Sequence, residues 1–399
     1  MNLLKNLNCD IFCTVVDNFG DIGVCWRLAK QLANEHGVHV RLWVDDLVSF
    51  QRLCKDLDVG SAVQRMNGVE IGRWEAPFVD VIPAQLVIEA FACELPENYV
   101  LAMSQLEHKP VWLNLEYLSA EDWVAGCHGL PSPHPKLPLV KYFFFPGFTS
   151  ETGGLLLEKN LFLHRDQFLA DPALQDSFWL NLGVPQRASD EVRVSLFCYE
   201  NQSVLALLAT WSAGQKRLTC IIPEGRILPQ VAEFFGCSVA VGDVLQRGNL
   251  RVHIVPFVDQ DAYDKLLWAC DINFVRGEDS CVRAQWAGKP FVWQIYPQHD
   301  GVHLLKMQAL LDLYCLGLKP EGVDAMHSMW ALWNRAGDEG NADQRAPMMK
   351  ITAWNNFLAQ QPMLQQHAGA WANKLSSNSL ALNLLDFSRK VGRIAPFEI

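Results

Sequence analysis

Residues 9–29 of the chain read CDIFCTVVDNFGDIGVCWRLA, and this stretch decides the fold class. The apolar run at 11–16 is typical of a buried strand, and a turn that contains Asp17 and Asp21 follows it. From Gly23 onward the apolar residues recur at helical spacing, so the stretch predicts the first half of a βαβ unit. Ligands of parallel α/β sheets bind at the carboxyl ends of the strands, and we therefore expect Asp17 and Asp21 to face a binding site.

Length and composition bound the class of protein. A chain of 399 residues is long for one hydrophobic core and suggests two domains. The formal net charge of -11 disfavours non-specific nucleic-acid binding, which depends on Lys and Arg neutralising phosphates. The sequence has neither the pattern of a signal peptide at its start nor a long uninterrupted apolar run. We therefore expect a cytoplasmic protein with no membrane or nucleic-acid partner.

The 12 cysteines favour buried thiols in a reducing compartment over disulfides. None of them lies in a Cys-x-x-Cys pair, and many occur inside apolar runs. A structural zinc site usually takes its ligands from two closely spaced Cys or His pairs, and that spacing is missing from this sequence. We therefore expect no metal site.

Alternating strand and helix patterns occur in two parts of the chain. After the opening unit, strands are predicted at 38–44, 69–74, 86–91 and 110–116, with helices between most of them. Residues 141–148 form either a further strand and turn of the first domain or core aromatics beneath a long loop. The pattern starts again with strands predicted at 193–199, 217–223, 251–257, 271–275 and 290–295. This alternation is the signature of a parallel sheet covered by helices on both faces. The sequence therefore predicts an α/β fold with two doubly wound domains.

The domain boundaries follow from where the pattern restarts. We place the first domain at 1–182 and the second at 190–366, with a linker near residue 185. The last helical segment, at about 367–399, is expected to cross back to the first domain. Its apolar residues would supply the packing face, namely Trp371, Leu375, Leu380, Leu384 and Phe387.

A second group of polar residues follows the strand predicted at 271–275 and precedes a helix. It consists of Arg276, Glu278, Asp279 and Ser280. Asp279 or Ser280 would cap the helix, which is the purely structural explanation for one of them. A guanidinium beside the free N–H groups of a helix start also suits a diphosphate, and carboxylates accept hydrogen bonds from sugar hydroxyls. This motif therefore favours a nucleotide-sugar site.

Other phosphate-binding motifs are absent. The first strand is followed by no Gly-x-Gly-x-x-Gly, and the sequence has no Gly-Lys-Ser/Thr loop, which disfavours a Rossmann dehydrogenase and a P-loop NTPase. A glycine-poor nucleotide site in the second of two α/β domains is typical of GT-B glycosyltransferases, whose domains face each other across a cleft. Phe257 and Tyr263 lie at or just after another strand end, where they either stack on a base or pack as ordinary core aromatics.

Three stretches carry a resemblance to one family. Residues 17–24 (DNFGDIGV), 256–264 (PFVDQDAYD) and 276–280 (RGEDS) resemble motifs of the EarP family of protein-arginine rhamnosyltransferases. The resemblance covers essentially the whole chain. It implies a GT-B enzyme that takes L-rhamnose from TDP-β-L-rhamnose and transfers it, with inversion, to one arginine in the N-terminal domain of elongation factor P. It also implies that no metal or other cofactor is needed.

The resemblance also implies residue roles. Asp21 corresponds to the general base, Asp17 supports it from the same loop, and Glu278 is a second carboxylate essential for activity. The positions that would bind the nucleotide sugar are Tyr199, Phe257, Gln260, Tyr263, Arg276, Asp279, Ser280 and Tyr296. In this arrangement Phe257 and Tyr263 would hold the thymine between them.

Two other functions share features with this reading. One is a GT-B transferase that uses another nucleotide sugar and a small-molecule acceptor, because it needs the same fold and the same type of diphosphate site. The other is a binding module without enzymatic activity. The carboxylates at the strand ends of both predicted domains disfavour the second alternative.

Overall fold

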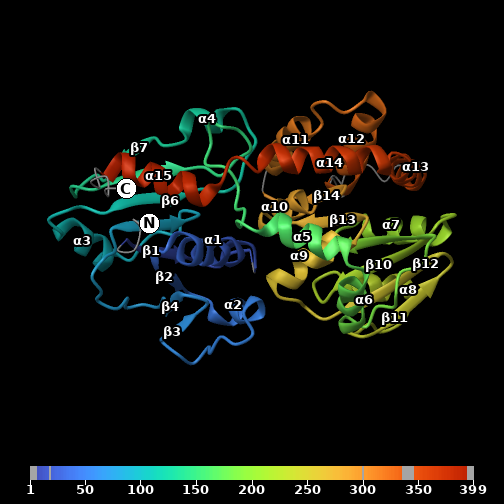
Figure 1. Ribbon diagram of the computed structural model, residues 1–399, viewed down its shortest axis with the longest axis horizontal. Helices are drawn as coiled ribbons and strands as arrows, with labels where there is room; N and C mark the ends of the chain where they lie inside the picture. The colour runs from blue at the N-terminus through green and yellow to red at the C-terminus, as the bar shows by residue number, and fades with distance from the viewer. Residues whose placement is uncertain (1–6, 18, 299–300, 335–345, 393–399) are drawn as a thin grey trace. The chain divides into compact units, whose positions relative to one another are not determined.

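The computed structural model describes residues 7–17, 19–298, 301–334 and 346–392, with the side chains of 346–350 excepted (Figure 1). The chain forms two compact units. Unit 1 comprises the chain up to Lys159 and the segment from Leu375 onward, and unit 2 comprises Asn160–Lys374. Each unit is built on one sheet, which confirms the prediction of two α/β domains.

Unit 1 contains an eight-stranded sheet with the order β3-β4-β2-β1-β5-β6-β8-β7. Its strands are β1 (Asn8–Cys13), β2 (His39–Val44), β3 (Val63–Met66), β4 (Val69–Arg73), β5 (Leu86–Ala90), β6 (Val111–Leu115), β7 (Pro131–Pro133) and β8 (Val140–Phe144). Its helices are α1 (Gly20–His36), α2 (Leu47–Leu53), α3 (Glu97–Gln105), α4 (Trp123–Cys127) and α15 (Leu380–Gly392).

The central strands of unit 1 are parallel and bring three loops to one edge of the sheet. β1 pairs with β5, and β5 pairs with β6, so that Phe12 lies opposite Glu89 and Ala90 lies opposite Leu115. The segments that follow these strands therefore start side by side at their carboxyl ends. Every residue of β5 and β6 is buried, as expected for strands covered on both faces.

Unit 2 contains a six-stranded sheet with the order β11-β12-β10-β9-β13-β14. Its strands are β9 (Glu191–Leu196), β10 (Arg217–Pro223), β11 (Val244–Arg247), β12 (Leu250–Val255), β13 (Ile272–Arg276) and β14 (Phe291–Gln294). Its helices are α5 (Leu161–Ala170), α6 (Pro172–Asn181), α7 (Val204–Ala213), α8 (Leu228–Phe235), α9 (Gln260–Ala269), α10 (Asp279–Ala287), α11 (Val302–Tyr314), α12 (Pro320–Asn334), α13 (Ala346–Ala359) and α14 (Gln361–Leu375).

Three short strands were not predicted from the sequence: β3, β7 and β11. Each pairs antiparallel with one neighbour at an edge of its sheet, and each carries exposed or half-exposed side chains. Such strands lack the apolar run that identifies a buried strand in a sequence.

The boundary between the units lies earlier than predicted. Unit 2 begins at Asn160, so that α5 and α6 belong to it rather than to the first domain. Phe168 of α5 packs on Trp268 of α9, with ring centroids 5.9 Å apart. The expected linker near residue 185 is also part of unit 2, because Val184 is buried and the guanidinium of Arg193 donates a hydrogen bond to the carbonyl of Pro185.

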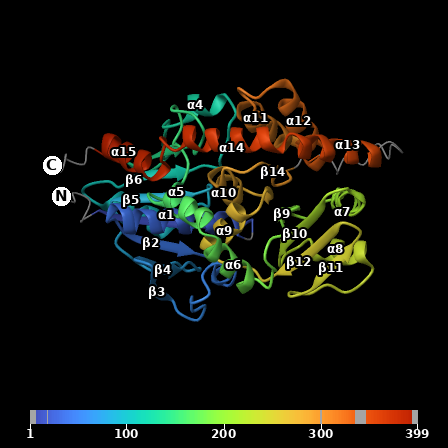
Figure 2. The same cartoon turned by 45° about the vertical axis from the view of Figure 1, so that its right-hand side comes forward.

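The C-terminal segment returns to unit 1 through α15 (Figure 1). Phe387 of α15 packs on the rings of Tyr142 and Phe144, with centroids 5.6 and 5.7 Å away. Trp371 was expected on the same returning face, and this expectation is wrong. Trp371 lies in α14 and packs on Tyr314 of α11, and Figures 1 and 2 both show α14 beside α11 and α12.

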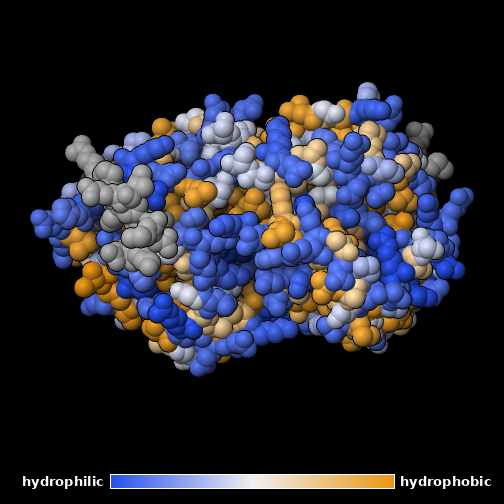
Figure 3. Space-filling view, viewed as in Figure 1, coloured by the Kyte–Doolittle hydropathy of each residue, from blue (hydrophilic) through white to orange (hydrophobic). Residues whose placement is uncertain are grey.

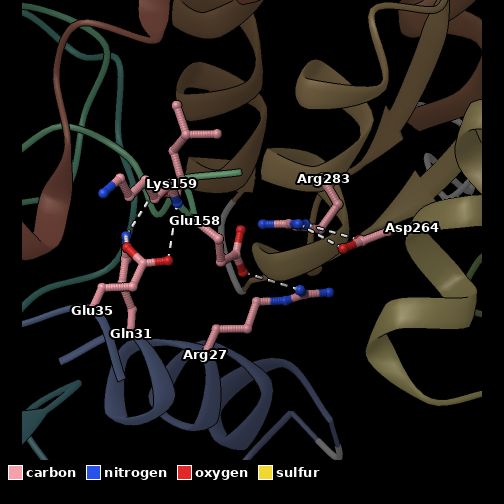
Figure 4. Close-up of polar contacts among 8 residues, drawn as sticks. Arg27, Gln31, Glu35, Glu158, Lys159, Asp264 and Arg283 are labelled. Atoms are coloured by element: carbon pink, nitrogen blue, oxygen red, sulfur yellow. Dashed lines mark hydrogen bonds and ion pairs between the residues drawn. The ribbon is translucent and has the colours of Figure 1, made fainter. Parts of the chain in front are cut away.

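Helix α1 anchors the last residues of the first part of unit 1 (Figure 4). The amide of Gln31 donates to the carbonyl of Leu157 at 2.6 Å, and Arg27 lies 3.4 Å from the carboxylate of Glu158. One turn further, Glu35 accepts a hydrogen bond from the backbone N–H of Lys159 at 2.9 Å. Three polar residues at helical spacing on α1 thus hold residues 157–159 just before the chain passes into unit 2.

A buried ion pair joins two helices inside unit 2 (Figure 4). Arg283 of α10 donates two hydrogen bonds, of 2.9 and 2.6 Å, to the carboxylate of Asp264 on α9. Because both side chains are almost fully buried, this two-bond geometry holds the middle of α10 in a fixed position against α9.

The surface of the protein carries both hydrophobic and hydrophilic residues. On the face shown in Figure 3, hydrophobic residues occur in small groups between hydrophilic ones. Among the residues that the structure describes, no helix is both long and apolar enough to cross a membrane.

Candidate functional site

Asp21 lies in the first turn of α1, because this helix begins at Gly20. The sequence had placed the helix start at Gly23 and Asp21 in the turn before it, and this expectation is wrong. The side chain of Asp21 is only 3% exposed. Its Oδ2 accepts hydrogen bonds from the backbone N–H groups of Val16 and Asp17, both at 2.8 Å. One carboxylate oxygen of Asp21 is therefore used to close the loop between β1 and α1.

The second oxygen of Asp21 faces a different partner. The hydroxyl of Tyr117 lies 3.5 Å from Oδ1 and donates to it. Burial raises the pKa of the Asp21 carboxyl above its ordinary value, and the charge of Asp17 raises it further. The hydrogen bonds from Asp17, Val16 and Tyr117 oppose this shift without cancelling it. A carboxylate with a raised pKa is a stronger base, as a proton acceptor requires.

Asp17 precedes α1 and is half-buried. Its backbone carbonyl accepts a hydrogen bond from the N–H of Gly20 at 2.7 Å. A Cβ atom at Gly20 would meet Oδ2 of Asp17 at 2.8 Å, so the absence of a side chain at Gly20 makes room for this carboxylate. The two acids predicted from the sequence therefore lie close together, Asp17 in the loop before α1 and Asp21 in the first turn of that helix.

Sequence reasoning missed two aromatic residues beside these acids. Tyr117 follows β6, and Phe91 follows β5. Their rings are stacked with centroids 4.5 Å apart and planes at 18°. Tyr117 comes directly after the strand predicted at 110–116, and Phe91 is the last residue of the strand predicted at 86–91, so their place at strand ends was the available signal. Their meeting with Asp21 depends on the order of the strands in the sheet, which periodicity does not show.

In unit 2, Arg276 ends β13 and lies between two aromatic rings. Its guanidinium is 4.3 Å from the ring centroid of Phe197 and 4.6 Å from that of Tyr199. It also donates a hydrogen bond to the carbonyl of Cys198 at 3.3 Å. The next residue, Gly277, has a φ of 60°, which lets the chain turn sharply into α10. The predicted diphosphate-binding cation thus has a fixed position at the carboxyl end of β13.

The start of α10 differs from the expected cap. The N-cap residue is Glu278, and neither Asp279 nor Ser280 caps the helix through its side chain. Instead, the hydroxyl of Ser280 accepts a hydrogen bond from the N–H of Arg276 at 3.0 Å and donates one to its carbonyl. Ser280 therefore closes the loop around Gly277, and Asp279 is half-buried in the first turn.

Glu278 forms an ion pair that the sequence did not reveal. Its Oε1 lies 3.0 Å from Nζ of Lys306 on α11, and both side chains are 18% exposed. Because Lys306 lies 28 residues further along the chain, no local motif connects the two. The ion pair fixes the position of the Glu278 carboxylate at the amino end of α10.

The other predicted donor residues lie around the same strand ends. Tyr199 packs edge-on against Tyr296, and Tyr263 of α9 packs on Phe197, with centroids 5.5 Å apart in both pairs. Gln260 is buried at the start of α9, and Phe257 is half-buried just before it. The structure therefore brings Tyr199, Tyr263 and Tyr296 together with Arg276, and the ring of Phe197 links Tyr263 to the guanidinium.

Over the described ranges of the chain, no three His, Cys, Asp or Glu residues come together in a way that could hold a metal ion.

Comparison with known proteins decides the family. A family model described as elongation factor P (EF-P) rhamnosyltransferase EarP matches residues 9–389. The chain belongs to the EarP family. The protein-arginine rhamnosyltransferase of Pseudomonas aeruginosa PAO1 is 46% identical over 380 residues, which cover 95% of this chain and 98% of that protein. Membership of this family confirms that the chain is a glycosyltransferase.

Solved structures support the same family and fold. One of them, described as the structural basis for EarP-mediated arginine glycosylation of translation elongation factor EF-P, is 33% identical with a TM-score of 0.68. It covers 96% of this chain and 99% of that one. A glycosyltransferase from Rickettsia africae shares the fold at 10% identity and a TM-score of 0.53, over 98% of this chain and 99% of that one. The predicted GT-B architecture is thereby confirmed, and α15 is the C-terminal helix that returns to the first unit.

Proposed function

We propose that this chain transfers L-rhamnose from TDP-β-L-rhamnose to an arginine side chain of translation elongation factor P, with inversion at the anomeric carbon. The observation that carries the proposal is the match of the EarP family model to residues 9–389. The name of the P. aeruginosa relative and the described subject of the EarP structure support the acceptor. The proposal includes no metal and no other cofactor, and it takes the N-terminal domain of elongation factor P as the acceptor domain.

The reaction forms one bond and breaks one. A terminal guanidinium nitrogen of the acceptor bonds to the anomeric carbon of rhamnose, and the bond from that carbon to the diphosphate oxygen breaks. TDP leaves with the bonding electrons, and the nitrogen loses one proton. Because free arginine has a pKa above ~12, a carboxylate does not remove this proton before attack, and we propose that the proton leaves as the new bond forms.

Asp21 is our choice for the proton acceptor. It is buried, its Oδ2 is held by two backbone N–H groups, and its raised pKa strengthens it as a base. Asp17, in the loop just before α1, supplies a second negative charge for the planar cation of the acceptor. Two adjacent carboxylates suit a guanidinium, which presents several N–H donors in one plane.

The donor is assigned to unit 2. Arg276 and the amino end of the α10 dipole would neutralise the diphosphate as it leaves. Ser280 holds the loop between them through its two hydrogen bonds to Arg276. Phe257 and Tyr263 are proposed to hold the thymine, and Tyr199, Gln260, Asp279 and Tyr296 complete the donor residues. Glu278 is proposed as the second essential carboxylate, positioned by Lys306.

Gly20→Ala is expected to lower turnover without unfolding the protein. The added Cβ would lie 2.8 Å from Oδ2 of Asp17, so the Asp17 carboxylate must move. Gly20 lies in α1 and outside the left-handed region, so that alanine suits its backbone. Displacement of a reacting group by about 1 Å can cost up to about 100-fold in rate. Steady-state kinetics measure the expected loss of turnover, and thermal unfolding checks that the variant stays folded. Unchanged kinetics would contradict a role for the Asp17 carboxylate.

The proposed function is tested by intact-protein mass spectrometry. Elongation factor P is incubated with this protein and TDP-β-L-rhamnose, and peptide mapping then locates the modification. We expect a gain of one deoxyhexose on a single arginine. Elongation factor P whose target arginine is replaced by Lys serves as the control and should gain nothing.

The same experiment separates the alternatives. If elongation factor P gains no sugar but TDP-β-L-rhamnose raises the melting temperature of this protein, the donor is right and the acceptor is wrong, because a ligand of the native state stabilises it. If UDP-glucose or UDP-GlcNAc stabilises the protein and TDP-β-L-rhamnose does not, a GT-B transferase with another donor is the better function.

A further inference from the structure

We propose that Phe91 and Tyr117 form an aromatic wall that receives the planar cation of the acceptor, and that the Tyr117 hydroxyl positions Oδ1 of Asp21 to accept its proton. The inference rests on the proposed function, since it names the residues that would recognise the acceptor side chain. It concerns unit 1 alone.

The aromatic wall lies at the same sheet edge as the two acids. Phe91 follows β5 and Tyr117 follows β6, and Ala90 pairs with Leu115 where these strands end. The two rings are nearly parallel, and Tyr117 keeps 37% of its surface exposed. Tyr117 also reaches Oδ1 of Asp21 with its hydroxyl. The wall therefore presents an accessible aromatic surface directly beside a buried carboxylate.

The backbone around Phe91 is held in an uncommon conformation. Phe91, Ala92 and Glu94 have φ values of 56°, 54° and 55°, in the left-handed region that non-glycine residues rarely adopt. Such residues persist only where the surrounding structure over-determines them. The carbonyl of Leu115 accepts from the N–H of Phe91 at 2.8 Å, and Oδ1 of Asn114 accepts from the N–H of Ala92 at 3.0 Å.

A buried carboxylate secures the far end of this loop. Oε1 of Glu89 accepts from the N–H of Glu94 at 3.3 Å, while Glu89 also pairs with Lys141 at 3.1 Å. The indole of Trp112 donates to the other carboxylate oxygen at 2.9 Å. The contacts of Glu89 thus join the loop after Phe91 to residues of β5, β6 and β8. The position of the Phe91 ring is therefore fixed by the sheet as well as by the loop.

The contacts of Asp21 assign separate tasks to its two oxygens. Oδ2 already accepts from two backbone N–H groups of the loop, at 2.8 Å each. Oδ1 has the longer contact of 3.5 Å to Tyr117, which leaves room for a stronger donor to approach it. Oδ1 is therefore the oxygen that takes the proton, and Tyr117 keeps it turned toward the aromatic wall.

This arrangement selects for a planar cation. A guanidinium stacks on an aromatic face through its flat surface while its edge donates hydrogen bonds to carboxylates. An ammonium group is compact and strongly hydrated, and it gains less from a stacked pair of rings. The wall thus explains, from this chain's own residues, how an arginine side chain would be preferred to a lysine.

A double-mutant cycle tests the stacking part. The dissociation constant of elongation factor P is measured by calorimetry without donor, for wild-type enzyme and Phe91→Leu, each with the native acceptor and with its target arginine changed to Gln. If the guanidinium stacks on the wall, the arginine substitution weakens binding about 2- to 30-fold more in wild-type enzyme than in Phe91→Leu. Equal effects in both enzymes would overturn the stacking.

Two further variants keep this test interpretable. Phe91→Asn removes the ring and tolerates the left-handed backbone, so it replaces Phe91→Leu if that variant does not fold. Trp123→Leu is the matched control, since Trp123 is 54% exposed in the same unit and packs on Phe145. Trp123→Leu should change the dissociation constant by the same factor for native elongation factor P and for the acceptor whose target arginine is changed to Gln.

Tyr117→Phe tests the positioning part. It keeps the stack but removes the hydroxyl, so the acceptor dissociation constant should stay unchanged while kcat falls about 2- to 10-fold. The hydrogen bond from Tyr117 lowers the pKa of Asp21, so its loss should also move the acid limb of the pH–rate profile to higher pH. An unshifted profile with unchanged kcat would overturn the role of the hydroxyl.

The wild-type reaction separates this inference from the proposed function. If wild-type enzyme adds no sugar to elongation factor P, the proposed function fails. If the wild-type enzyme is active but Phe91 and the acceptor arginine show no coupling, only the aromatic wall is overturned.

Discussion

Asp21→Asn is expected to lower kcat by about 10²–10⁴-fold and to leave donor binding unchanged. An amide cannot take the proton that leaves the guanidinium. Its carbonyl oxygen can still accept the two backbone hydrogen bonds that Oδ2 accepts now, so the loop before α1 should keep its shape. Single-turnover kinetics with elongation factor P and TDP-β-L-rhamnose measure the rate, and calorimetry measures donor affinity.

The same substitution is expected to raise thermal stability at neutral pH. Burial raises the folded-state pKa of Asp21, so the ionised carboxylate costs folding free energy above that pKa. As the pH falls through the raised pKa, the carboxylate of the wild-type protein is protonated and this cost disappears. The Asn side chain is neutral at every pH, so the variant never has this cost. The difference in melting temperature should therefore be larger at about pH 7 than at about pH 4.

The raised pKa of Asp21 is also expected to set the pH dependence of activity. The base must be ionised, so kcat/KM should fall as the pH is lowered through that pKa, and the fall should begin at a higher pH than for an ordinary aspartate. Asp56→Asn, an exposed carboxylate lost from the same unit, is the matched control and should change neither rate nor stability appreciably. Turnover of Asp21→Asn at the wild-type rate would refute the base assignment.

Arg276→Met is expected to lower kcat/KM for the donor by about 10²–10³-fold. The guanidinium lies between the rings of Phe197 and Tyr199 at the carboxyl end of β13, beside the start of α10. Methionine can fill the space between the rings, but it removes the positive charge that the leaving diphosphate requires. TDP affinity, measured by calorimetry, should fall with it, since both phosphates of the donor remain in TDP.

The control for this change is Arg251→Met. Arg251 is exposed on β12 in the same unit, and its loss removes the same charge from the protein. It should leave TDP affinity and kcat/KM near the wild-type values. If Arg276→Met bound TDP as tightly as wild type does, Arg276 would not be the cation that binds the diphosphate. Lys306 of α11, which pairs with Glu278 at the start of α10, would then be the next candidate.

The sequence by itself determined the fold class and located two polar motifs where buried strands end. The apolar runs of β1, β5 and β6 and the helical spacing from Gly23 onward are local features, so periodicity was enough to predict the strands and the body of α1. Asp17 and Asp21, like Arg276 and Ser280, are close neighbours in the chain. Residues so near in sequence stay near in space wherever the chain turns from a strand into a helix. Short sequence motifs were therefore enough to predict that each pair lies together.

The tertiary structure alone decided which distant residues meet these motifs. Asp21 and Tyr117 are separated by 96 positions, and they meet because β1, β5 and β6 are adjacent parallel strands that end at one edge. Lys306 reaches Glu278 only because α11 packs near the start of α10. The unit boundary at Asn160 depends likewise on the packing of α5 on α9. Strand order and helix packing are set by the burial of whole surfaces, which no local pattern of residues records.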